Sequence, residues 1–137
     1  MITGILPYLN FAGNAQQAMA FYEQALGAQV LSKMLFDEMP GGAQGMSGVM
    51  HATLQLGQAT IMLSDVPPQM GGVTPGTNQH LMVNLAEPGQ VDALFEKLAD
   101  GGRVLMPVDN TFWGARFGQV VDRFGVSWML HAELPQD

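Results

Sequence analysis

The pattern of predicted secondary structure in residues 1–66 repeats in residues 78–137. In each half, a strand is followed by a helix and then by three more strands. The first half has its predicted strand, helix, strand and hairpin at 4–13, 14–27, 29–36 and 49–66. The second half has the same elements at 78–86, 88–102, 103–108 and 115–134. This order predicts an α+β fold made of two paired βαβββ modules.

A short sequence echo supports duplication as the origin of the two halves. The segment FYEQALGAQVL, from Phe21, aligns with FEKLADGGRVL, from Phe95, and phenylalanine, glycine, valine and leucine coincide along it. A helix covers one face of a four-stranded sheet, so we expect the remaining faces to meet. The modules would then form a half-open barrel with a central cup, within a single domain over 1–137. The loop 67–77 would join the halves 1–66 and 78–137.

Composition limits the kinds of partner that this chain can bind. Of the 137 residues, 47% are apolar and 12% are charged. So little charge predicts that some apolar surface is buried against a second copy, as a homodimer. The formal net charge of −7 and the absence of a basic run argue against a nucleic-acid partner.

Other classes of protein are excluded by what the sequence lacks. There is no cysteine, so disulfides and thiolate metal sites are ruled out. No apolar run approaches the ~20 residues of a membrane span, and no secretory signal is seen, so we expect no membrane partner and a cytoplasmic location. The Gly-rich turn of a methyltransferase, a phosphate-binding loop and a nucleophile elbow are missing as well.

Local signals mark the ends of several elements. Asn14 is a candidate N-cap, and Gly27 stands where a helix stop belongs. Residues 122–125 have the composition of a hairpin turn, with Gly125 supplying a positive φ. The long loops 37–48 and 67–77 are expected to be lids, dimer contacts or spacers between the halves.

Four sequence blocks carry a family resemblance. They are PYLNFAGNAQQAMAFYEQALGA (7–28), FDEMP (36–40), HATLQLGQATIMLSD (51–65) and TFWGARFGQVVDRFGVSWML (111–130). In this order they resemble PhnB-like proteins of the vicinal-oxygen-chelate superfamily, which includes glyoxalase I, extradiol dioxygenases and bleomycin-resistance proteins. The resemblance implies the paired βαβββ fold with its cup, and a homodimer.

The resemblance also indicates where a metal would be held. Metal-using relatives bind a divalent ion through four side chains, and the matching positions here are Pro7, Met62, His80 and Met129. Proline has no donor and a thioether is a soft ligand, so His80 alone suits a hard divalent ion. Zinc or nickel glyoxalase chemistry needs three or four nitrogen or oxygen ligands. We therefore expect no cofactor, with a divalent metal on His80 as the alternative.

Two further histidines are candidate site residues. His131 lies two residues beyond Met129, so both point to the same sheet face, and His51 lies on the strand beside Met62. Each could join His80 in a ligand site or complete a metal site. Each could also be an ordinary hydrogen-bonded or half-exposed histidine.

Strand alternation groups methionines with polar side chains. The residues that share a face are Thr60, Met62 and Ser64; His80 and Met82; and Ser127, Met129 and His131. A mainly apolar wall with a few polar tips is typical of a small-molecule pocket, and methionine adapts to ligands of varied shape. The alternative is that these methionines simply fill a core.

An aromatic–arginine pair stands at the start of the closing hairpin. Trp113 precedes a strand that carries Arg116, and together they could grip an anionic or carbonyl ligand at the rim of the cup. Alternatively, Arg116 is a surface side chain lying over an aromatic at a dimer seam. Trp128 has the opposite parity to Met129 and is expected to pack beneath a helix. Acidic residues such as Asp92 on the helix exterior are expected to be solvated.

Taken together, these features favour a PhnB-like, glyoxalase-fold protein that binds a small organic ligand without the superfamily metal. The ligand-binding residues predicted for the cup and its rim are His80, Met62, Met129, His51, Trp113 and Arg116. One alternative is a metal-dependent lyase, isomerase or dioxygenase of the same superfamily. Another is a drug-sequestering protein that resembles bleomycin-resistance proteins. The sequence assigns neither a substrate nor a reaction.

Overall fold

Two compact units make up the chain. The structure is a computed structural model that describes residues 1–136. The first unit is Met1–Thr74 and the second begins at Pro75, so the boundary lies inside the predicted connecting loop 67–77. Each unit is one βαβββ module with a four-stranded sheet, which confirms the predicted α+β class. Among the described residues, no helix has the length and apolar character needed to cross a bilayer.

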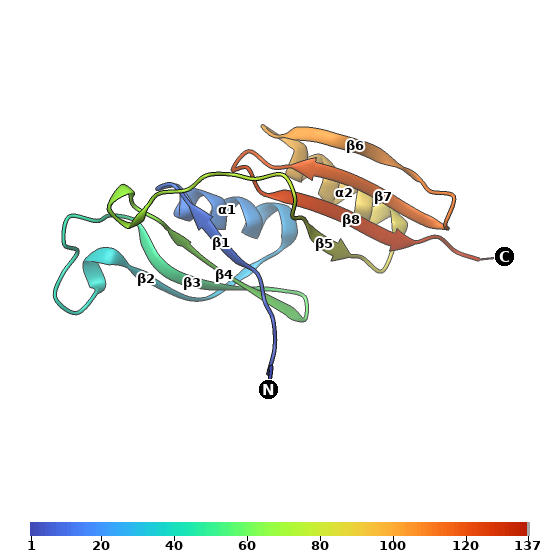
Figure 1. Cartoon of the computed structure of the whole chain (residues 1–137). Coiled ribbons are helices and arrows are strands. Elements are labelled where there is room, and N and C mark those ends of the chain that lie inside the picture. Colours follow the sequence, from blue (N-terminus) through green and yellow to red (C-terminus); the bar gives the residue numbers. More distant parts are fainter. Residues whose placement is uncertain (137) are drawn as a thin grey trace. The chain divides into compact units, whose positions relative to one another are not determined.

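The first unit contains a mixed sheet and one face-covering helix. Its elements are β1 (Tyr8–Phe11), α1 (Ala15–Leu26), β2 (Gln29–Leu35), β3 (Val49–Leu56) and β4 (Ala59–Asp65). The strand order is β1-β4-β3-β2, with β1 parallel to β4 and the other neighbours antiparallel. Helix α1 lies against β2, β3 and β4 (Figure 1), where Leu54 and Leu63 are fully buried.

Helix α1 has an apolar face because apolar side chains recur along it at helical spacing. The buried residues along it are Ala15, Ala18, Met19, Tyr22 and Ala25. Gly27 ends the helix in the left-handed conformation at φ 69°, as predicted. Asn14 occupies the N-cap position, but its side chain makes no capping hydrogen bond.

The carboxylate of Asp65 performs that capping role from the end of β4. Its Oδ1 accepts hydrogen bonds from the backbone N–H groups of Gly13 and Ala15, at 2.9 and 3.0 Å, and its Oδ2 accepts one from Val49 at 2.9 Å. Asp65 is only 3% exposed. A Cβ on Gly48 would collide with this carboxylate, so the glycine makes room for it. Asp65 therefore ties the start of α1 to the sheet.

The second unit repeats the architecture. Its elements are β5 (Leu81–Asn84), α2 (Pro88–Ala99), β6 (Arg103–Asn110), β7 (Ala115–Val121) and β8 (Ser127–Glu133). The order β5-β8-β7-β6, with β5 parallel to β8, matches that of the first unit. Helix α2 contacts β6, β7 and β8, and the β8 residues Trp128 and Leu130 are buried on that side. This confirms the predicted position of Trp128 beneath a helix.

A second buried carboxylate organises the turn between β7 and β8. Asp122 is 3% exposed and accepts hydrogen bonds from the N–H groups of Phe124 and Val126, at 2.8 and 3.1 Å. Its other oxygen accepts a 2.8 Å hydrogen bond from Nε1 of Trp128. Gly125 has a φ of 87°, as the predicted hairpin turn requires.

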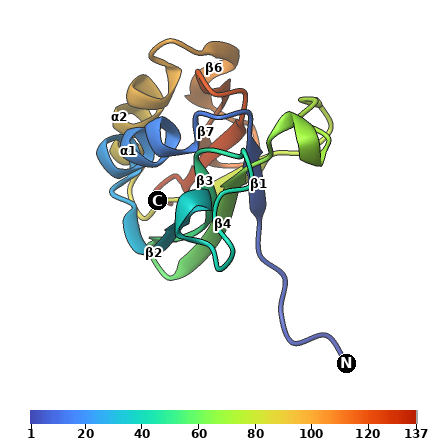
Figure 2. The ribbon, with the colours of Figure 1, turned by 90° about the vertical axis from the view of Figure 1, so that its left-hand side faces the viewer.

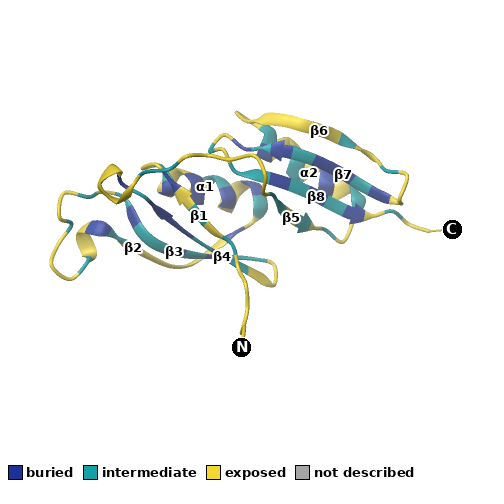
Figure 3. Ribbon diagram, in the orientation of Figure 1, coloured by how far each residue is buried: buried dark blue, intermediate teal, exposed yellow. Residues whose placement is uncertain are grey.

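The outer strands β2 and β6 are exposed along almost their whole length, as the yellow ribbon of Figure 3 shows. Both strands have a register irregularity at the same place in the repeat, around Leu31 in β2 and Leu105 in β6. These two leucines are 53% and 43% exposed. Each unit therefore has a sheet edge with apolar side chains in contact with solvent.

The strand boundaries differ from the prediction mainly at the start of each half. Strand β1 begins at Tyr8 rather than at residue 4, because it pairs with only the last four residues of β4. Pro7 still accepts a hydrogen bond from Met62, and the segment before it runs away from the sheet (Figure 2). Strand β5 is likewise limited to its four pairs with β8. Strand β6 continues to Asn110, two residues beyond the prediction, since Asp109 and Asn110 still pair with β7.

Candidate functional site

Each sheet has a face that its own helix does not cover, here called the helix-free face. In the first unit, Met62 lies on this face between Tyr8 of β1 and Thr53 of β3, its two register partners. The alternating residues Ile61 and Leu63 are buried on the helix side. The predicted grouping of Met62 with Thr60 and Ser64 is therefore correct within this unit.

A hydrogen-bonded pair crosses the helix-free face of the first unit. The hydroxyl of Tyr8 lies 3.1 Å from Nδ1 of His51, and the ring centroids are 5.8 Å apart. One strand step away, the hydroxyl of Ser64 lies 3.3 Å from Oδ1 of Asn10. His51 is thus already engaged, and the polar groups of this face surround Met62.

The helix-free face of the second unit is also lined by methionine and polar residues. Met129 has Met82 and Gln119 as register partners, and one step along β8 His131 has Asn84 and Phe117. Met82 is 53% exposed. The predicted grouping of Met129 with His131 is correct, and Gln119 and Asn84 add amide groups to this face.

A small hollow of about 360 Å³ lies at the end of this face. Its lining includes Trp113, His131 and Glu133, with the segment 134–136 on one side. The Trp113 ring meets the rings of Phe112 and Phe117 edge-on, with centroids 5.0 and 6.0 Å away. The structure therefore brings the predicted rim residue Trp113 to the predicted histidine His131.

Arg116 has a different environment from the one the sequence suggested. It pairs in register with Ala132, so it lies on the helix side of the sheet and not on the face of His131. Its Nε and Nη2 donate to the two carboxylate oxygens of Asp92 on α2, at 2.9 and 3.0 Å, and Nη1 donates to Oδ1 of Asn110 at 3.0 Å. Asp92 was expected to be a solvated residue on the helix exterior. Its carboxylate instead holds the guanidinium of Arg116 in place.

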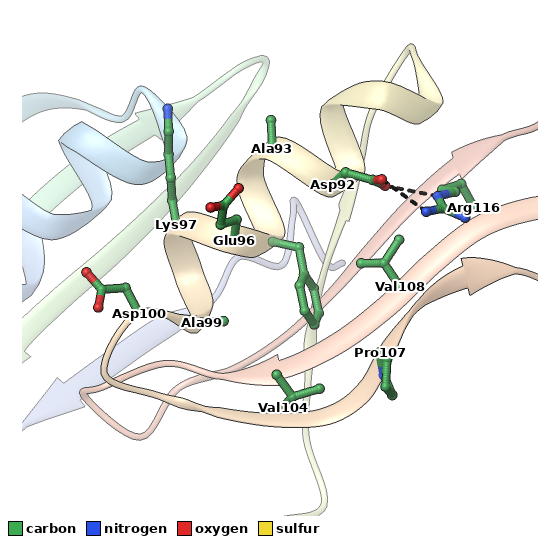
Figure 4. A pocket seen from close by; sticks show the side chains of 11 residues that line it. Asp92, Ala93, Glu96, Lys97, Ala99, Asp100, Val104, Pro107, Val108 and Arg116 are labelled. Atoms are coloured by element: carbon green, nitrogen blue, oxygen red, sulfur yellow. Dashed lines mark hydrogen bonds and ion pairs between the residues drawn. The ribbon is translucent and has the colours of Figure 1, made fainter.

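The ion pair between Arg116 and Asp92 stands at one end of an open groove between α2 and β6 (Figure 4). The groove has a volume of about 1140 Å³, with Val104, Pro107 and Val108 lining it from β6. Hydrogen bonds from the guanidinium lower the pKa of the Asp92 carboxyl below its ordinary value. The same hydrogen bonds raise the pKa of Arg116. The pair therefore remains charged throughout the neutral range.

His80 immediately precedes β5, in a half-buried position. Its Nδ1 is buried and has no hydrogen-bond partner among the described residues. Met82, rather than His80, lies beside Met129 in the register of the sheet. The fold of the second unit therefore places His80 one strand step away from the methionine pair.

Comparison with known proteins identifies the family. Residues 4–130 match the family described as the Glyoxalase/Bleomycin resistance protein/Dioxygenase superfamily. The chain belongs to this superfamily. The match covers nearly all of both βαβββ units, and it confirms the resemblance that the four sequence blocks indicated.

Several relatives of this superfamily chain are similar over almost their full length. Protein YjdN of Escherichia coli (strain K12) is 37% identical over 142 residues, covering 95% of each chain. The crystal structure of PA1353 from Pseudomonas aeruginosa has a TM-score of 0.88 at 36% identity, covering 98% of this chain and 100% of that one. The PhnB protein of Bacillus cereus has a TM-score of 0.75 at 29% identity, with 95% and 99% coverage.

The donor set of this superfamily chain does not fit the divalent metal that the resemblance implies. The four positions that the sequence resemblance suggested carry Pro7, Met62, His80 and Met129, and His80 alone among these side chains offers a nitrogen or oxygen donor. The carbonyl of Pro7 accepts a 3.0 Å hydrogen bond from the Met62 N–H, as part of the sheet. Among the described residues of either unit, no three His, Cys, Asp or Glu side chains gather around one possible ion position.

Sequence reasoning missed several residues on these surfaces. The resemblance pointed to Pro7, but in the parallel pairing of β1 with β4 it is the next residue, Tyr8, that lies beside Met62. Glu133 follows His131 at the same parity and could have been found in the same way. The capping role of Asp65 has no local signal, since its partners Gly13 and Ala15 are some fifty residues away in the chain.

Proposed function

We propose that this chain is a PhnB-like protein that binds a small organic molecule against the helix-free face of a sheet, without a catalytic metal. The observation that carries the proposal is the shared make-up of the two faces. Each places a methionine, Met62 or Met129, among hydroxyl, amide and imidazole groups. An apolar, adaptable wall with a few fixed polar groups suits a small ligand.

We also propose that the chain acts as a homodimer in the cytoplasm. The low charge content leaves apolar side chains at the surface, most clearly on the edge strands β2 and β6. Contact with a second copy would remove these side chains from water. The PhnB protein of Bacillus cereus is also named as a 3-demethylubiquinone-9 3-methyltransferase, but no methyltransferase motif supports that activity here.

A fragment screen on matched variants tests ligand binding. A panel of small organic molecules is screened against the full chain by ligand-observed NMR, and the hits are repeated on Met82→Glu and Met70→Glu. Both methionines are more than half exposed, at 53% and 60%, so neither charge should prevent folding. Met82 lies on the helix-free face and Met70 lies on the connecting segment. We expect Met82→Glu to lose the hits and Met70→Glu to keep them.

Metal analysis of protein purified without a histidine tag tests the other part of the proposal. We expect less than stoichiometric manganese, iron, nickel and zinc, because the donor set at the family positions is poor. A stoichiometric metal that is lost in His80→Ala would instead support a metal-dependent lyase, isomerase or dioxygenase. A panel without hits would contradict the proposal, and hits that Met82→Glu leaves unchanged would contradict binding at the helix-free face of the second unit.

A further inference from the structure

We propose that the hollow at the end of β8 binds the positively charged end of an organic ligand, such as an ammonium or quaternary ammonium group. The groups that would hold the cation are the indole of Trp113 and the carboxylate of Glu133. This inference rests on the proposed function and deepens it, because it names a chemical class for part of the ligand.

The backbone holds these two side chains at one end of the β7–β8 hairpin. Glu133 is the register partner of Ala115, the first residue of β7. Just beyond this pair, the N–H of Leu134 donates a 2.9 Å hydrogen bond to the carbonyl of Gly114, which follows Trp113 directly. Backbone hydrogen bonds of the sheet therefore hold Trp113 and Glu133 at the same hollow. Their proximity does not depend on a long flexible loop.

Trp113 has the properties of a fixed aromatic platform. Its ring packs edge-on against the buried ring of Phe117, at an interplanar angle of 67°. The ring of Phe112 also meets it edge-on, at 90°, but is itself 98% exposed. Even so, 56% of the residue is exposed. A large ring that is both held in place and open to solvent can receive a ligand at little entropic cost. Tryptophan is also the aromatic side chain that attracts cations most strongly.

The charge around the hollow favours a cation. Glu133 forms no ion pair with another described residue, so its carboxylate has no cationic partner among them. Arg116, on the neighbouring strand β7, lies on the opposite side of the sheet and is held by Asp92. His131 adds a ring nitrogen to the lining, and the net charge of −7 attracts cations from solution.

The size of the hollow suits a headgroup rather than a large molecule. A volume of about 360 Å³ is near the lower end of the range for small-molecule sites. The hollow continues from the face that carries Met129 and His131, both of which lie on β8 with Glu133. A ligand with its cation in the hollow could therefore extend its uncharged part along the helix-free face.

A titration with isosteric probes tests this inference. The probes are choline, 3,3-dimethylbutan-1-ol and 3,3-dimethylbutanoate, which share a shape and are cationic, neutral and anionic. Binding to the full ¹⁵N-labelled chain is followed through the two indole N–H signals, which Trp113→Phe assigns. Trp128 is 2% exposed and bonded to Asp122, so its signal serves as an internal reference. We expect choline to shift the Trp113 signal, with about fivefold higher affinity than the neutral alcohol.

Matched charge variants separate the hollow from the overall charge of the chain. Glu133→Gln is expected to lower choline affinity about fivefold and to leave the alcohol unaffected. Glu23→Gln removes the same charge from the exposed side of α1 and should change neither. Equal binding of the alcohol and choline, or equal effects of the two variants, would overturn the cation inference. The proposed function would still be tested separately, because the fragment screen measures whether hits are lost in Met82→Glu and does not depend on Glu133.

Discussion

The hydroxyl of Tyr8 and Nδ1 of His51 lie 3.1 Å apart, although 43 residues and the strand β4 separate them. Tyr8 is on β1 and His51 is on β3, so their contact passes over the central strand beside Met62. The contact fixes the orientation of one imidazole nitrogen and leaves the other available to a ligand.

Tyr8→Phe tests this contact directly. Tyr8 is 49% exposed, so the loss of its hydroxyl is expected to change the free energy of unfolding by less than about 1 kcal/mol. Ligands that use His51 should bind more weakly, because the ring is no longer oriented. Urea denaturation measures the first effect and NMR titration with the screened fragments measures the second. A large loss of stability would show that the pair is structural.

Asp65→Ala is expected to destabilise the first unit severely. The substitution leaves three N–H groups without their acceptor, those of Gly13, Ala15 and Val49. Each such loss in the interior costs about 1–3 kcal/mol, so we expect a decrease of about 4 kcal/mol in the free energy of unfolding. Asp37→Ala, at an exposed aspartate, is the control and should change it by less than about 0.5 kcal/mol. Similar denaturation midpoints for the two variants would contradict this account.

Gly48→Ala provides an independent test of the same carboxylate. Gly48 has a φ of 97°, and an added Cβ would meet the carboxylate of Asp65. Gly42→Ala is a matched control, because Gly42 also has a large positive φ, 85°, but open space where its Cβ would be. Backbone strain alone costs about 1 kcal/mol in either variant. We expect urea denaturation to show a clearly larger loss for Gly48→Ala, and equal losses would disprove the packing argument.

Arg116→Gln is expected to raise the pKa of Asp92 toward its ordinary value. The guanidinium lowers that pKa in the folded chain, so the pair stabilises the fold above the unfolded pKa of about 3.9. This contribution is lost as the pH falls through the lowered folded pKa. NMR titration of the Asp92 carboxyl carbon measures the shift. Arg103→Gln, on the neighbouring strand β6, should leave that titration unchanged.

Leu105→Glu and Leu31→Glu test the proposed homodimer. Both leucines are exposed at equivalent register irregularities of the edge strands, where a charge would oppose an apolar contact. Light scattering after gel filtration should give the wild type twice the 14.7 kDa chain mass, and at least one variant a single chain mass. Ile5→Glu, at a 91% exposed apolar residue of the N-terminal segment, is the control. A monomeric wild type would contradict the proposal.

Much of the fold could be predicted because its signals are local. The 3.6-residue spacing of Ala18 and Tyr22 identified α1, Gly27 marked its end, and alternation identified the faces of β4 and β8. The length of β1 was overestimated because an apolar run does not reveal how many residues its partner strand offers. Pairing with β4, and not composition, starts the strand at Tyr8.

The candidate site was harder to predict because it depends on non-local partners. Strand parity correctly grouped Met129 with His131, but it gave no sign that Arg116 would turn to Asp92 on α2. The choice between the two faces of β7 is made by the helix that packs there. A carboxylate on α2 twenty-four residues earlier in the chain then captures the guanidinium.

The two buried aspartates have an implication for the order in which the chain folds. The three donors to Asp122 described above are two to six residues away, so these bonds can form as soon as that short segment exists. Two of the donors to Asp65 lie 50 and 52 residues away, so its bonds must wait for a long segment of chain to come together. In pulse-labelled hydrogen exchange, we expect the amides of Phe124 and Val126 to gain protection before those of Gly13 and Ala15.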